Sequence, residues 1–62
     1  MKVYVAVGGW AYDTAEPIGV FTTQEEAMDV AKEWDKQSLG AFAYVQPFEV
    51  GVSGPAGDEV FA

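Results

Sequence analysis

The chain has 62 residues with ten Asp or Glu, three Lys, no Arg, no His and no Cys, and its formal net charge is −7. This composition excludes histidine acid–base catalysis, thiolate nucleophiles and Cys/His metal sites. Half of the residues are apolar, which excludes a disordered acidic tail and indicates a single folded domain over residues 1–62. No stretch reaches the roughly 20 apolar residues of a membrane span, so we expect a soluble, cytoplasmic protein.

The first predicted element is a β-strand over residues 2–7. Val3, Val5 and Val7 alternate there with Lys2, Tyr4 and Ala6, a period that is typical of a half-buried strand. A connection over residues 8–17 follows and ends at a proline. Residues 18–21 then predict a second short strand, which Gly19 weakens.

A helix over residues 23–39 is the best-defined predicted element. Two overlapping capping boxes precede it, Thr22 with Glu25 and Thr23 with Glu26. An apolar stripe at helical spacing predicts the face that packs on the sheet, made of Ala27, Val30, Ala31 and Trp34. Ser38 and Leu39 are expected to end the helix, with Gly40 as a left-handed cap.

Residues 41–50 predict a third strand, in which Pro47 favours an edge position or a bulge. Phe42, Tyr44, Phe48 and Val50 share one parity of this strand. Residues 51–62 are rich in glycine and form either a flexible tail or a short fourth strand through Val60 and Phe61. The order β-β-α-β predicts an α+β fold, half of a ferredoxin-like unit. One helix would cover a three- to four-stranded antiparallel sheet with the first strand at its centre.

Enzymatic chemistry finds no support in the sequence. Ser38 and Ser53 have no histidine to activate them, and residues 51–55 lack the pattern of a nucleophile elbow. The carboxylates of residues 13, 16, 58 and 59 lack the spacing of a calcium loop, so we interpret them as solvated charges. We therefore predict no enzyme, no catalytic residue, no cofactor and no metal.

The acidic side of the predicted helix suggests a binding surface. Glu25, Asp29 and Glu33 recur every four residues, with a rise of about 6 Å per step that is close to the spacing of phosphates along a nucleic-acid strand. Such a row would fit a basic groove. The same charges also suit ordinary helix stabilisation, because Asp29 with Lys32 and Glu33 with Lys36 form i, i+3 pairs.

The loop after the first strand holds a second group of candidate binding residues. Trp10 and Tyr12 lie there beside Asp13 and Glu16, and large aromatic side chains in loops are frequent anchors of protein interfaces. They equally suit a small core that needs every aromatic side chain it has. Both interpretations stay open.

Three segments resemble small uncharacterised proteins of phages and mobile elements: residues 2–5, residues 18–23 and residues 25–27. The small size, the acidity and the missing catalytic residues also resemble phage anti-CRISPR proteins, some of which act as nucleic-acid mimics. This second resemblance is one of type, because no diagnostic motif defines that group. It assigns no site residues.

The resulting hypothesis is an acidic phage-type inhibitor in the cytoplasm of a bacterial host. It would occupy the basic groove of a nucleic-acid-binding protein, a CRISPR effector complex above all, and block DNA or RNA binding by charge mimicry. We expect a monomer or weak homodimer that binds neither nucleic acid nor membrane directly. The alternative is a protein-interaction or homodimerisation module without mimicry.

Overall fold

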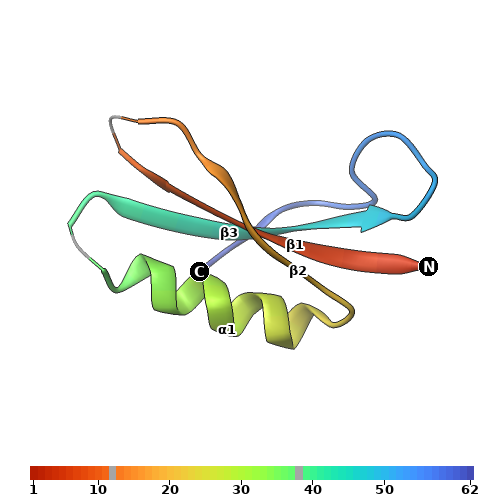
Figure 1. The fold of residues 1–62 in the computed structure, drawn as a ribbon, viewed down its shortest axis with the longest axis horizontal. Helices are drawn as coiled ribbons and strands as arrows, with labels where there is room; N and C mark the ends of the chain where they lie inside the picture. The colour runs from red at the N-terminus through yellow and green to blue at the C-terminus, as the bar shows by residue number, and fades with distance from the viewer. Residues whose placement is uncertain (12, 38) are drawn as a thin grey trace.

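The structure is a computed structural model that describes residues 1–11, 13–37 and 39–62. A four-stranded antiparallel sheet in the order β2-β1-β3-β4 packs against one helix (Figure 1). This confirms the predicted α+β fold and the central position of the first strand. The elements are β1 (Lys2–Trp10), β2 (Glu16–Phe21), α1 (Gln24–Asp35), β3 (Ala41–Glu49) and β4 (Val60–Phe61).

Strand β1 continues through Gly8 and Gly9 to Trp10, three residues beyond the predicted end. The glycines are explained by close contacts on both sides of the sheet. A Cβ atom on Gly8 would lie 2.7 Å from the ring of Trp34, and one on Gly9 would lie 2.8 Å from the ring of Phe42. Glycine is thus required here because aromatic rings pack directly on the strand backbone.

Helix α1 begins as predicted and ends early. The Thr23 hydroxyl accepts a hydrogen bond from the Glu26 backbone N–H at 3.2 Å and donates one to the Glu26 carboxylate at 2.9 Å. Thr23 is therefore the N-cap, and of the two predicted capping boxes this one forms.

The predicted helix end at Leu39 is wrong, since α1 stops at Asp35. The Gln37 N–H bonds to the Trp34 carbonyl, which tightens the last turn. Gly40 has the expected positive φ of 91° but lies at the entry to β3, where its carbonyl accepts a hydrogen bond from Ala11 N–H at 2.6 Å.

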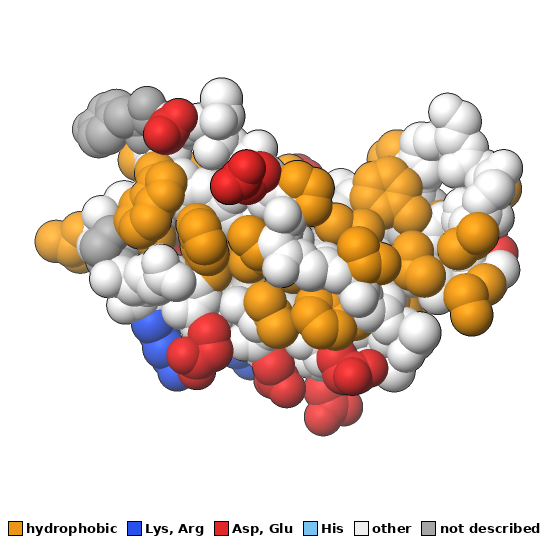
Figure 2. Space-filling view, in the orientation of Figure 1, with side chains coloured by type: hydrophobic (Ala, Val, Ile, Leu, Met, Phe, Trp, Pro, Cys, Tyr) orange, Lys and Arg blue, Asp and Glu red, His pale blue; other side chains and the backbone are white. Residues whose placement is uncertain are grey.

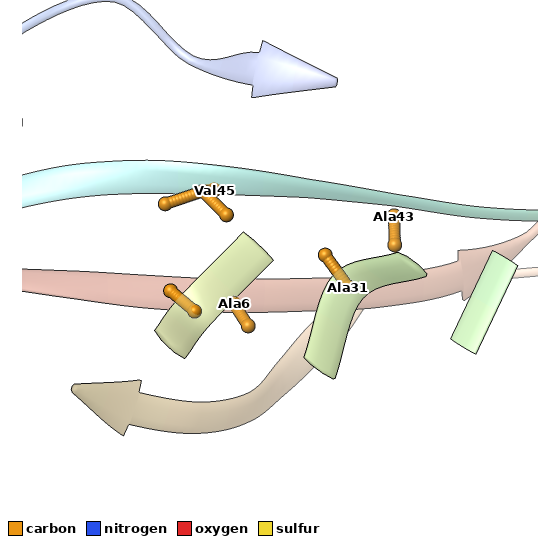
Figure 3. Close-up of a cluster of buried hydrophobic side chains, with 5 residues drawn as sticks. Ala6, Ala31, Ala43 and Val45 are labelled. Carbon is orange, nitrogen blue, oxygen red and sulfur yellow. The ribbon is translucent and has the colours of Figure 1, made fainter. Parts of the chain in front are cut away.

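Small side chains fill the space between α1 and the sheet (Figure 3). The fully buried apolar residues are Ala6, Ala27, Ala31, Ala43 and Val45. Larger side chains close the margins of this layer, among them Trp34, whose indole N–H donates to the Gly9 carbonyl at 3.2 Å. The predicted helix stripe is thus confirmed, and alanines let the helix approach the sheet closely.

The chain after β3 folds back along that strand instead of forming a free tail. Ala56 N–H bonds to the Pro47 carbonyl at 2.8 Å, and the Gln46 side chain donates to the Gly57 carbonyl at 2.7 Å. Strand β3 is an inner strand whose register with β1 is regular through Pro47, so the predicted edge position or bulge is not observed. The segment around Pro55 lies beside Pro47 where β4 does not pair. The predicted alternative of a short fourth strand is confirmed by β4.

The contact between Trp34 and Gly8 can be tested from either side. Trp34→Ala should lower the free energy of unfolding by about 3–5 kcal/mol, because it removes a packed ring and its hydrogen bond. Gly8→Ala should lower it by about 1–3 kcal/mol, because the added methyl group collides with that ring. Denaturant unfolding followed by circular dichroism measures both changes.

Gly57→Ala is the matched control for the second change. Its nearest neighbour would be Pro47 Cγ at 3.2 Å, and Gly57 does not have a positive φ. A Gly8→Ala variant as stable as Gly57→Ala would show that the indole does not pack on β1 as described.

Candidate functional site

The first candidate surface lies at the end of β1, where Trp10 closes the helix layer. The Trp10 and Trp34 rings have centroids 5.7 Å apart at an interplanar angle of 51°. Trp10 is 36% exposed. One side of the indole thus packs against the core margin and the other faces solvent, so Trp10 combines the two roles that the sequence left open.

The predicted neighbours of Trp10 do not form a compact cluster. Asp13 bonds to the loop itself, its carboxylate accepting from Thr14 N–H at 2.7 Å. Glu16 lies in β2 opposite Gly8. Tyr12 lies outside the described residues. An open pocket of about 370 Å³ does form beside the loop, lined by Trp10, Ala11, Asp13, Leu39 and Gly40.

The second candidate surface is the outer side of α1. Glu25, Asp29 and Glu33 are all exposed there, as their spacing predicts. Lysines interrupt the row toward its C-terminal end, because Lys32 and Lys36 project from the same side of the helix at i, i+4 spacing. Figure 2 shows acidic side chains along the lower margin, over α1, and basic ones at the C-terminal end of the helix.

One of the two predicted ion pairs on this helix is present. Glu33 lies 3.8 Å from Lys36, and both side chains are exposed, so the pair adds little stability. Within the described residues no ion pair joins Asp29 to Lys32. The N-terminal ammonium instead pairs with Glu49 at 2.9 Å, away from the helix.

A third surface, which the sequence analysis did not identify, is the side of the sheet that α1 leaves uncovered. Side chains alternate along a strand, so residues neighbouring the buried Ala6, Ala43 and Val45 face away from the helix. We call this surface the open face. Its residues are Val3, Val5, Val7, Val20, Phe42, Tyr44, Gln46, Phe48 and Phe61.

The open face is apolar apart from Gln46, and it is most accessible at its two edges. Val20 is 63% exposed and Phe61 is 61% exposed. The strand registers place them beside other apolar residues, since Val20 pairs with Val5 and Phe61 with Tyr44. The Tyr44 and Phe61 rings lie 5.2 Å apart at 50°. A continuous uncharged surface therefore crosses all four strands.

Loops bound the open face at both ends of the sheet. In Figure 1 the sheet is seen nearly edge-on with α1 below, and the β1–β2 connection and the segment after β3 both rise on the opposite side. The outline in Figure 2 dips between these two ends, with hydrophobic side chains across the dip and acidic side chains on its β1–β2 side. The open face is thus the floor of a shallow trough.

The signal for the open face was present in the sequence. Strand β1 carries apolar residues on both parities, with valines on one and Tyr4 and Ala6 on the other. A strand in a sheet with one solvated face should alternate apolar with polar residues. Both faces of this sheet are largely apolar, and residues 1–11, 13–37 and 39–62 contain a single helix to cover one of them.

The described residues contain no group of three or more Asp or Glu side chains placed to hold a metal ion. Among the described helices, none has the length and apolar composition needed to cross a membrane.

Substitution of Trp10 separates its two roles. Trp10→Ala should lower the free energy of unfolding by about 1–2 kcal/mol, because it removes a tilted aromatic contact and part of the cover over Trp34. Trp10→Phe should lower it less, since a smaller ring is retained. Thermal unfolding measures both effects, and an unchanged melting temperature for Trp10→Ala would show that the Trp10 ring does not contribute to folding stability.

No curated protein and no solved structure matches the chain. A family match covers residues 1–54, which include the whole of β1, β2, α1 and β3 and exclude β4. The matched segment therefore contains the contact between Trp34 and β1 and most of the open face. The chain belongs to the family described as a domain of unknown function, DUF7336.

Proposed function

We propose that this chain is a protein-interaction module that binds another protein chain through the open face. The observation that carries the proposal is a largely apolar surface across four strands that no described helix or strand covers. Contiguous exposed apolar patches of more than a few hundred Å² are rare on monomers and mark interaction sites. Aromatic side chains such as Phe48 and Phe61 are the type enriched at the centre of protein interfaces.

The distribution of charge supports the open face over the helix as the main contact surface. All nine open-face residues are uncharged, whereas five of the ten carboxylates belong to α1 on the opposite side of the sheet. Binding through the open face therefore requires no desolvation of a carboxylate of that helix. The acidic layer keeps the remaining surface soluble while the apolar layer binds.

Charge mimicry is the second candidate function. Glu25, Asp29 and Glu33 are exposed along one side of α1, and this observation favours binding to a basic groove. The target would be a nucleic-acid-binding protein, such as a CRISPR effector complex of a bacterial host, as the type resemblance implies. Lys32 and Lys36 weaken this candidate, because a phosphate mimic needs an uninterrupted row.

Two lysine substitutions test the open face. The tagged parent and tagged Val20→Lys are each used to capture partners from a bacterial lysate that also contains an untagged copy of the chain. Val20→Lys should capture at least about 90% less partner than the parent. Tagged Val52→Lys is the control, because Val52 is 60% exposed, lies outside the open face and receives the same charge. Equal capture by both variants, measured by quantitative mass spectrometry, would contradict the proposal.

Removal of the helix charges tests the second candidate. The combined Glu25→Gln, Asp29→Asn and Glu33→Gln substitutions remove three charges while the shape of each side chain is kept. If mimicry operates, this variant should displace DNA from a purified CRISPR effector complex at least about tenfold less well than the parent, and the parent's own affinity should fall with added salt. A folded variant that competes equally well would exclude the helix row as a mimic.

A further inference from the structure

We infer that the open face is covered by the open face of a second copy of this chain. The result would be a symmetric dimer with four layers, in the order helix, sheet, sheet, helix. This inference rests on the proposed function, since it names the partner for the same surface. Four features of the chain support it: the composition of the core, the area of the open face, the position of the charges and the shape of the sheet.

The core on the helix side of the sheet is built from small side chains, and larger ones such as Phe21 and Trp34 are only partly buried at its margin. Its fully buried apolar residues are four alanines and Val45, the largest of them. The larger side chains Phe42, Tyr44 and Phe48 lie on the open face and are only partly buried. A domain of about 60 residues is marginally stable even with a full core. Pairing two open faces would place these aromatic side chains in a common interior.

The area of the open face fits a small dimer interface. The molecule measures 35 × 21 × 16 Å, and Figure 1 shows the two layers stacked along the intermediate axis. The face therefore spans roughly 35 × 16 Å, or about 560 Å² per copy, which gives about 1,100 Å² for two copies. Specific interfaces begin near that total area.

The net charge of −7 does not oppose this arrangement. The two copies meet through uncharged residues, and both α1 helices lie on the outside. Packed sheets are about 10 Å apart, so the acidic helices are separated by more than the Debye length of about 8 Å at physiological salt. Repulsion between the helices is thus largely screened. A basic partner suits the open face less well than a second copy, because the open-face residues include no carboxylate to pair with it.

The shape of the sheet is self-complementary. A twisted sheet has a saddle form, and in Figure 1 strand β2 crosses β1 and β3 at a large angle. Two twisted sheets pack face to face in the aligned arrangement, with their mean strand directions within about 30° of each other. This arrangement keeps the long axes of the two open faces nearly parallel, so the faces overlap over most of their area.

Sedimentation equilibrium of the purified full chain tests the inference directly. The parent should approach twice its chain mass of 6.7 kDa at tens of micromolar, and its melting temperature should rise with concentration. Val20→Lys should raise the dimer dissociation constant at least about tenfold, because it places a charge in the apolar interface. Val52→Lys should dimerise as the parent does.

Phe61→Ser, at the other edge of the open face, is the second variant in case Val20→Lys does not fold. Circular dichroism checks folding, and lysine on an edge strand such as β2 is generally tolerated. A parent that remains at 6.7 kDa at several hundred micromolar would overturn the inference. If the parent stays monomeric but Val20→Lys still captures less lysate protein than the parent, the proposed function stands and only the dimer is rejected. If the parent stays monomeric and Val20→Lys captures as much lysate protein as the parent, the dimer and the proposed function are both rejected.

Discussion

The close approach of α1 to the sheet is the constraint on which the rest of the structure depends. The Trp34 ring occupies the space that a side chain on Gly8 would take, and its indole N–H bonds to the Gly9 carbonyl. Alanines on both layers allow this separation. Large side chains cannot fit between layers so close together, which leaves the aromatic residues of β3 on the other side.

The sequence predicted the parts of the fold that depend on local chemistry. Thr23 with Glu26 gave the helix start, and apolar spacing gave the face that contains Ala27, Ala31 and Trp34. The predicted helix end was wrong because residue helix propensities do not reveal the tightened turn in which Gln37 N–H bonds to the Trp34 carbonyl. The extension of β1 through Gly8 and Gly9 was missed because glycine normally ends a strand, and here it makes room for rings from distant residues.

The candidate sites also differ in whether local sequence or tertiary packing determines them. Exposure of Glu25, Asp29 and Glu33 follows from helical spacing alone and was predicted. The open face depends on which side of the sheet the helix covers, and the alternation in residues 2–7 does not contain that information. The alternation in residues 2–7 predicted a half-buried strand without saying which side the helix covers, and the structure turns its valines away from α1 and places them beside the aromatic residues of β3.

The separation of charge and apolar surface between two layers also limits how far assembly can proceed. Once two open faces meet, the exposed surface of the dimer consists largely of its two acidic helices and the loops. A third copy would then approach a like-charged surface, and its own open face would find no apolar patch to cover. The high net charge, which first suggested mimicry of a nucleic acid, thus has a second physical role in keeping an apolar sheet face from open-ended aggregation.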